Sequence, residues 1–240
     1  MEILTIVLFT FVASVVGTAT SFGTSTFMIP VLGFFYPLNI ALLFSGIIHW
    51  FGNIWRMLFF RSGKQWKLIL TFGIPGIIAS YLGAQLVPDI SEVFLSRLLG
   101  IFFVLYVIFL FKNKDWKLKP NTPSAILGGI LSGFSSGIFG VGGAIRAAFL
   151  SAYGLKKEIF FFTAAAIGLF IDSGRVVKYL LDGVRLENNL LLALAIAIPV
   201  SFLGGYVGKK LTDKIPSESF RNVIAIALLI IAVKYILFPG

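Results

Sequence analysis

The sequence contains no cysteine and only one histidine among its 240 residues. Without cysteine the chain has no disulfide, no thiolate nucleophile and no sulfur ligand for a metal. A lone histidine makes a soft-metal centre equally unexpected, so we predict neither a metal site nor a cofactor. Charged residues are also scarce, at 12% of the chain. With so few side chains able to act as nucleophile or base, an enzyme is the least favoured functional class.

Long polar segments are missing as well, because 58% of the residues are hydrophobic and recur in blocks from end to end. This composition predicts an all-α polytopic membrane protein embedded in the lipid bilayer. The N-terminus lacks the basic region of a cleaved signal peptide, so we expect it to remain a membrane segment. The formal charge of +10 comes from short loops rather than a basic face. It therefore predicts contact with an anionic inner leaflet and no nucleic-acid partner.

Ten apolar blocks can be marked, and six of them are long enough to cross the bilayer core. The other four form two adjacent pairs, whose arms reach only about 18 to 23 Å at ~1.5 Å per residue, against a core of ~30 Å. We favour two re-entrant hairpins, although strongly tilted full crossings also fit these lengths. The blocks are residues 3–17, 24–36, 40–60, 68–87, 94–111, 125–137, 142–153, 159–181, 190–208 and 220–238.

Each short pair is interrupted by a break of small or hydroxyl-bearing residues, at 21–26 and at 138–146. Non-helical backbone at membrane depth survives only where it is buried or lines a cavity, so the breaks predict a transport site. The helix leaving each break begins with free N–H groups and a positive dipole end, which suit an anion. The alternative is that these residues only permit tight helix crossing. The candidate anion-binding residues are Ser21, Gly23, Thr24, Ser25, Gly140, Gly142, Gly143 and Arg146.

Arg146 is the most informative of these candidates. It lies in the middle of a short apolar arm, where a charge is costly unless it faces protein, water or an anion. Its planar fork of five donors suits sulfite, sulfonate or carboxylate oxygens. The alternatives are an arginine that snorkels to the cytoplasmic interface or one that neutralises a buried carboxylate.

The two halves of the chain match as an internal repeat. Phe22-Gly23 aligns with Phe139-Gly140, and Pro75 with Pro199. Basic loops alternate with neutral or acidic loops, and basic loops prefer the cytoplasm. Both termini are therefore predicted outside the cell, and the halves have opposite orientations, as in secondary transporters with a midplane site. The predicted units are a first repeat (1–111), a cytoplasmic linker (112–124) and a second, inverted repeat (125–240), each repeat being a short re-entrant-like hairpin plus three transmembrane helices.

Asp172 and Arg175 lie three residues apart on one helix face, and their repeat equivalents, Asn53 and Arg56, share a face with His49. These five residues are candidates for gating or coupling, with Arg56 expected toward the cytoplasmic mouth and Arg175 toward the outer mouth. His49 or Asp172 could carry a proton, but a lone histidine in an apolar helix is more often a packing residue. The alternatives are a structural ion pair for Asp172 and Arg175 and a snorkelling cation for Arg56.

These motifs make the chain resemble the TauE/SafE family of sulfite exporters over essentially its whole length. The resemblance is carried by Phe22-Gly23-Thr24-Ser25 with Pro30, by the 138–146 segment, and by Asp172-Ser173-Gly174-Arg175. It implies a small two-repeat membrane protein, each half opening with a glycine-rich hairpin, that moves sulfite, organosulfonates or other small anions. The first break departs from the usual glycine run by carrying threonine and serine, and Ala147 stands where a proline would match Pro30.

The leading prediction is a secondary transporter that exports a small oxyanion, sulfite or an organosulfur or organic acid, across the cell membrane. Alternating access between the two repeats would move the anion. An inside-negative potential favours anion exit by ~2.3 kcal/mol per charge per 100 mV, so little coupling to a proton or other ion is needed. The alternatives are an anion channel or an uptake permease for a sulfonate or carboxylate. The sequence is also compatible with an oligomer.

Overall fold

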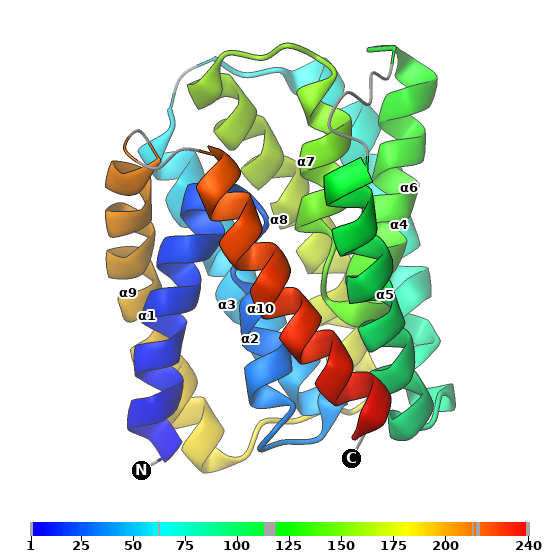
Figure 1. The fold of residues 1–240 in the computed structure, drawn as a ribbon, viewed down its shortest axis with the longest axis vertical. Coiled ribbons are helices and arrows are strands. Elements are labelled where there is room, and N and C mark those ends of the chain that lie inside the picture. Colours follow the sequence, from blue (N-terminus) through cyan, green and yellow to red (C-terminus); the bar gives the residue numbers. More distant parts are fainter. Residues whose placement is uncertain (1, 62, 113–118, 213, 215–216, 239–240) are drawn as a thin grey trace.

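The protein folds as a bundle of helices that run along its long axis (Figure 1). The computed structural model describes residues 2–61, 63–112, 119–212, 214 and 217–238, and within them the regular elements are helices only. They are α1 (Glu2–Thr20), α2 (Ser25–Leu32), α3 (Leu38–Phe59), α4 (Trp66–Gln85), the 3-10 turn η1 (Val87–Asp89), α5 (Glu92–Lys112), α6 (Thr122–Phe139), α7 (Gly143–Ser151), α8 (Lys157–Leu181), α9 (Asn188–Leu211) and α10 (Ser217–Leu237).

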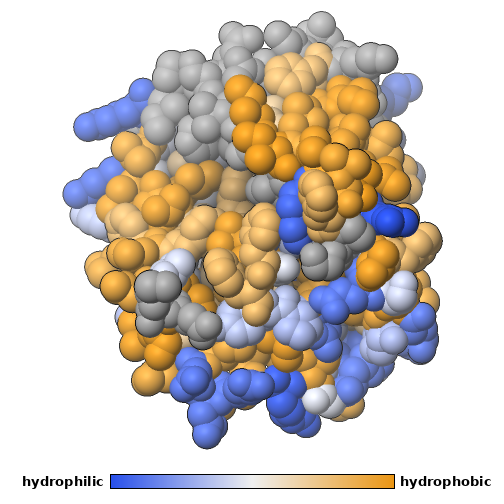
Figure 2. All heavy atoms as spheres, turned by 60° about the horizontal axis from the view of Figure 1, so that its bottom comes forward, coloured by the Kyte–Doolittle hydropathy of each residue, from blue (hydrophilic) through white to orange (hydrophobic). Residues whose placement is uncertain are grey.

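Each predicted apolar block corresponds to one α-helix, so the all-α polytopic membrane fold is confirmed. Five segments of the described chain, in α1, α3, α4, α8 and α9, are long and apolar enough to cross a membrane. Hydrophilic residues gather at the end of the molecule where the termini lie, and hydrophobic residues dominate the flank above it (Figure 2). At the opposite end, Trp66 is half exposed beneath the Lys64 amine, as a membrane-interface anchor would be.

The hairpins differ from the prediction in the lengths of their arms. The first arms, α1 and α6, have 19 and 18 residues, or about 27 to 29 Å, so the short length predicted for them is wrong. The short arms are α2 and α7, with 8 and 9 residues. Hydroxyl residues near each break bond carbonyls of their own helix, Thr20 to Val16 in α1 at 2.7 Å and Ser135 to Ser132 in α6 at 3.3 Å. The helices end only where Ser21 and Gly140 adopt positive φ values of 63° and 69°.

Helix packing has the same pattern in the two predicted repeats. α4 packs against α6 just as its equivalent α9 packs against α1, while α3 pairs with its own equivalent α8, and α5 with α10. Figure 1 shows α1 running away from the end that carries both termini and its equivalent α6 running toward it. Opposite chain directions and a shared contact pattern are what an inverted-topology repeat requires.

The two repeats are intertwined rather than side by side. A Cβ added to Gly133 of α6 would overlap the Gly76 carbonyl of α4, and one added to Gly208 of α9 would lie 2.5 Å from the Val15 carbonyl of α1. Such backbone contact is typical of small residues at membrane helix interfaces. The first helix of each repeat is therefore joined tightly to the fourth helix of the other, and the sequence repeats are not separate packing units.

The predicted sidedness can be tested by cysteine labelling, because the chain has no cysteine of its own. Asp89 lies between α4 and α5, at the end of the bundle that carries the termini (the termini end). Lys156 lies between α7 and α8, at the opposite end (the linker end), and both residues are exposed. Asp89→Cys should react with an impermeant maleimide from outside intact cells, and Lys156→Cys only after the membrane is permeabilised. Labelling of both from the same side would contradict the topology.

Candidate functional site

The structure brings the two breaks into contact in the interior of the bundle. The Ser25 hydroxyl donates a hydrogen bond to the Gly140 carbonyl at 2.8 Å, linking the first break to the second. Gly143 packs so closely on the Phe22 carbonyl that a Cβ there would overlap it. Ser21 and Thr24 are 1% and 4% exposed, so these irregular segments are buried in protein. The breaks therefore meet the condition for non-helical backbone at membrane depth.

The predicted glycines have a clear packing role at this contact. Gly23 and Gly140 adopt left-handed conformations, with φ of 93° and 69°. Gly23 packs against the His49 ring, and Gly142 against the Ser132 carbonyl, so neither position has room for a side chain. Tight packing thus accounts for these glycines, as the alternative interpretation held. Neither α2 nor α7 has a side-chain cap, which leaves the N–H groups of their first turns without side-chain acceptors.

Asp172 is the centre of a buried polar network between α3 and α8. Its Oδ2 accepts a hydrogen bond from the Asn53 amide at 2.7 Å and lies 2.9 Å from His49 Nδ1. Its Oδ1 accepts from Arg175 Nε at 2.9 Å and lies 2.8 Å from Nη2 of the same guanidinium. Arg56 completes the network by donating to the Asn53 carbonyl oxygen and lying 3.3 Å from His49 Nε2. All five predicted gating or coupling residues are therefore in one cluster.

Three arginines of this region are buried, with exposed fractions of 2% for Arg56, 1% for Arg146 and 0% for Arg175. The snorkelling alternatives for Arg56 and Arg146 are therefore wrong. Arg56 and Arg175, expected toward opposite mouths, belong to one cluster, because the Asn53–Asp172 hydrogen bond joins their partners. A helical side chain leans toward the N-terminus of its helix, and this lean carries Arg56 inward to Asn53 and His49.

The cluster departs from the repeat symmetry where Arg146 approaches it. Since Asn53 matches Asp172, the position equivalent to His49 is Gly168. A Cβ on Gly168 would lie 2.8 Å from the Asn53 amide and 3.0 Å from Arg146 Nη2. In the first repeat this position carries the His49 side chain. In the second repeat the corresponding space is filled by the Arg146 guanidinium. The absence of a side chain at Gly168 lets Arg146 reach the Asn53–Asp172 pair.

Positive charge exceeds negative charge in this buried region. The guanidiniums of Arg56, Arg146 and Arg175 carry three positive charges, and Asp172 is the only buried carboxylate among the described residues. No hydrogen-bond partner lies within reach of Arg146 Nε and Nη2 or of Arg56 Nη1 in the described structure. Unpaired buried cations cost several kcal/mol each, of the order of the desolvation penalty of an ion. An anion placed among these N–H groups would offset that cost.

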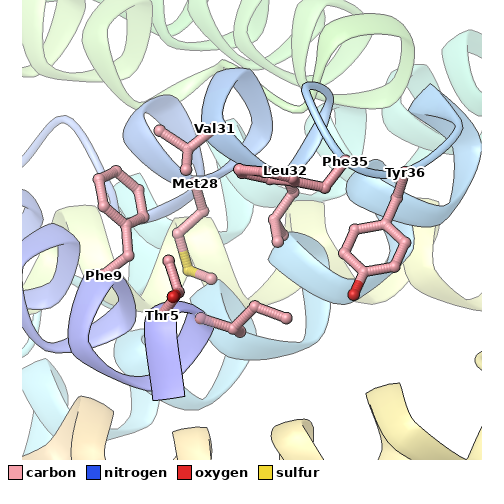
Figure 3. Close-up of a pocket in the computed structure, with 8 residues that line it drawn as sticks. Thr5, Phe9, Met28, Val31, Leu32, Phe35 and Tyr36 are labelled. Carbon is pink, nitrogen blue, oxygen red and sulfur yellow. The ribbon is translucent and has the colours of Figure 1, made fainter. Parts of the chain in front are cut away.

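Two apolar cavities of the structure lack charged groups that could bind an anion. Figure 3 shows one between α1 and α2, where Thr5 and Phe9 lie opposite Met28 and Leu32. A second lies between α5, α6 and α7 and is lined by the repeat equivalents of Met28 and Leu32, residues 145 and 149. Neither cavity is lined by a charged residue, so neither is a site for an anion. Among the described residues no group of three or more His, Asp or Glu side chains could hold a metal ion.

The sequence interpretation overlooked Tyr179. It lies one turn after Arg175 on α8, is 1% exposed, and donates a hydrogen bond to the Gly137 carbonyl of α6. Its spacing from Arg175 was the available signal, because residues four apart share a helix face.

Comparison with known proteins agrees with this architecture. The model of the family described as "Sulfite exporter TauE/SafE" matches residues 6–235. The chain is also 25% identical over 246 residues to a "Probable membrane transporter protein" of Methanocaldococcus jannaschii, with 90% of this chain and 88% of the relative covered. The resemblance inferred from the breaks and from the Asp172–Arg175 segment is confirmed. The chain belongs to the sulfite exporter TauE/SafE family of membrane transporters.

Proposed function

We propose that the protein is a secondary transporter that exports a small oxyanion across the cell membrane, and that the anion binds at the buried arginines between the two breaks. The substrate class is sulfite or a small organosulfur or organic acid. The observation that carries the proposal is the excess of buried guanidinium charge, with N–H groups of Arg146 and Arg56 left without partners. Structural ion pairing alone would leave no donors unused.

The chemistry of the cluster suits an oxyanion. Guanidinium N–H groups form short, charge-assisted hydrogen bonds with negatively charged oxygens, often two at a time. The first turns of α2 and α7 add backbone N–H groups and the positive ends of two helix dipoles. Asp172 holds Arg175 in place but leaves two arginines uncompensated. A small anion with several oxygens can satisfy more of these donors than a halide can.

Alternating access would use the two tightly packed helix pairs as moving units. α4 is bound to α6, and α1 to α9, by glycines that bring their backbones into contact. α3 and α8, which hold the cluster, pack against each other and against these pairs. Rocking of the α4–α6 pair relative to the α1–α9 pair would expose the cluster to one side at a time. This replaces the predicted movement between whole sequence repeats, because those repeats are intertwined.

Export requires no strong ion coupling in this scheme. The membrane potential, negative inside, favours exit of an anion by ~2.3 kcal/mol per charge per 100 mV. Asp172 and His49 contact each other at 2.9 Å and remain candidates for carrying a proton if coupling occurs.

Transport is tested with purified protein in liposomes and 35S-labelled sulfite. We expect protein-dependent flux that saturates with concentration and accelerates when unlabelled sulfite is present on the opposite side. Such counterflow is the signature of a carrier whose site faces one side at a time. A flux that does not change when anion is added on the opposite side would indicate a channel. The proposal would be contradicted if neither sulfur oxyanions nor small carboxylates were transported at all. Liposomes containing Arg146→Gln protein are the matched control.

A further inference from the structure

We propose that Tyr179 and Phe60 are the two gates of the transport path, one at each end of the arginine cluster. The inference rests on the proposed alternating-access function. Asn53 and Arg56 match Asp172 and Arg175 in the repeat, so the same offset makes Phe60 the equivalent of Tyr179. Each aromatic residue follows a cluster arginine by four residues and lies one turn further out, Tyr179 within α8 and Phe60 as the residue that caps α3. Because the repeats are inverted, the two rings lie toward opposite ends of the bundle.

Tyr179 closes the end of the molecule that carries the termini. A cavity of about 270 Å³ at this end, called the vestibule here, is lined by residues of the α2–α3, α4–α5 and α8–α9 connections, by the start of α5 with Glu92, and by Tyr179. The next turn of α8 inward carries Arg175, whose side chain lies beside the Tyr179 hydroxyl. Tyr179 lines the vestibule and is only 1% exposed, and Arg175 lies one turn further in on the same helix. An anion entering the vestibule would have to displace this ring to reach Arg175.

Phe60 closes the linker end. It follows the last residue of α3 and is 4% exposed. Its ring stacks on Phe161 of α8, with centroids 4.7 Å apart and planes 14° from parallel. The Lys209 amine lies 5.7 Å from the centre of the same ring, which places a cation just outside this closure. Since Phe60 caps α3 and Phe161 belongs to α8, separating the linker ends of these two helices would open the path toward Arg56.

The two closures are held by different interactions. The Tyr179 hydroxyl is bonded to the Gly137 carbonyl, in the last turn of α6 before the second break. Opening this gate breaks that hydrogen bond and frees the α6 end, so the gate is linked directly to the hairpin. Phe60 has no hydroxyl, and its closure depends on ring stacking and burial. The described structure has both rings buried and is therefore an occluded state.

Accessibility of cysteines placed next to the cluster tests the gates without measuring transport. Ser45 and Ala164 are repeat equivalents, both 0% exposed, located one turn from His49 and Gly168. Ser45→Cys reports on the Tyr179 side, and Ala164→Cys on the Phe60 side. The reagent is a small, membrane-impermeant methanethiosulfonate added to one side of oriented proteoliposomes. We expect Tyr179→Ala to raise the labelling rate of Ser45→Cys from the termini side by about tenfold or more. Phe60→Ala should raise the labelling rate of Ala164→Cys from the linker side by a similar factor.

Conservative variants separate gating from misfolding. Tyr179→Phe keeps the ring but loses the bond to Gly137, so its labelling rate should fall between those of the parent and Tyr179→Ala. Phe60→Tyr should keep the parent rate. If an alanine variant does not fold, the leucine variant replaces it. Unchanged labelling in both gate variants, or faster labelling from the same side in both, would overturn the proposal. If the gate variants change the labelling rates as expected but the protein moves no anion, the gates are supported and the proposed transport function is rejected.

Discussion

Replacing Arg146 by glutamine is expected to lower the affinity for the transported anion by about 10- to 100-fold. A hydrogen bond to a charged group is worth about 1.5–3 kcal/mol, and every 1.4 kcal/mol is a factor of ten in affinity. Arg146 Nε and Nη2 have no hydrogen-bond partner in the described structure, so these donors are available to a ligand. Glutamine retains a polar tip of similar reach but has neither the charge nor the fork.

The same substitution should leave the empty protein at least as stable as the wild type. Arg146 is 1% exposed and its charge is not balanced by a carboxylate of its own, so its removal relieves a desolvation penalty. The measurement is thermal unfolding in detergent with and without sulfite. Sulfite should stabilise the wild type, and Arg146→Gln should need about 10- to 100-fold more sulfite for the same stabilisation. Arg185→Gln, an exposed arginine at the termini end, is the control and should behave as wild type. A large loss of stability in the empty Arg146→Gln protein would show that Arg146 has a structural partner instead.

The second large effect is expected from Asp172→Asn, which should lower the free energy of unfolding by about 3–5 kcal/mol, the cost of leaving buried charges unpaired. Asp172 contacts His49, Asn53 and Arg175 at 2.7 to 2.9 Å. Asparagine keeps the shape but leaves the arginines of the cluster without a counter-charge. Equilibrium unfolding in mixed micelles measures the change, and added sulfite should restore part of it.

A symmetric exchange provides the matched control. Asn53 and Asp172 are repeat equivalents that hydrogen-bond to each other, so Asn53→Asp combined with Asp172→Asn moves the carboxylate only across their contact. In the double variant the new carboxylate would face Arg56, which already donates to residue 53. We expect more than half of the lost stability to return. A double variant no more stable than Asp172→Asn would mean that the position of the carboxylate, rather than the charge balance, is decisive.

The sequence was sufficient for features that depend on local pattern. The ten α-helices of the described residues follow from runs of apolar residues, and the breaks follow from Gly23 and Gly140, which the structure places at positive φ. The pairing of Asp172 with Arg175 follows from their spacing on one helix, and it is present at 2.8–2.9 Å. The resemblance of the motifs then led to the family that the comparison confirmed.

Features that depend on packing between helices could not be predicted from the sequence pattern. Arg56 lies three residues before the end of α3, which suggested an interfacial cation, but α8 supplies Asp172 and draws the polar network inward. The predicted lengths of α1 and α6 are too short because the prediction treats serine and threonine as helix-ending residues. In an apolar helix their hydroxyls can instead bond backbone carbonyls of the preceding turn, and the helix continues. The intertwining of the repeats is set by the contacts of glycines such as Gly133, whose partners lie in the other repeat.

The most direct test of the anion site is a structure determined with selenite, an oxyanion shaped like sulfite whose selenium can be located by anomalous scattering. We predict a single strong selenium peak within hydrogen-bonding reach of Arg146 and Arg56, facing the first turns of α2 and α7. The Arg146→Gln protein, treated in the same way, should lack it. Selenium bound only at surface lysines, or an interior that stays unoccupied at saturating selenite, would contradict the assignment of the buried arginines as an anion site.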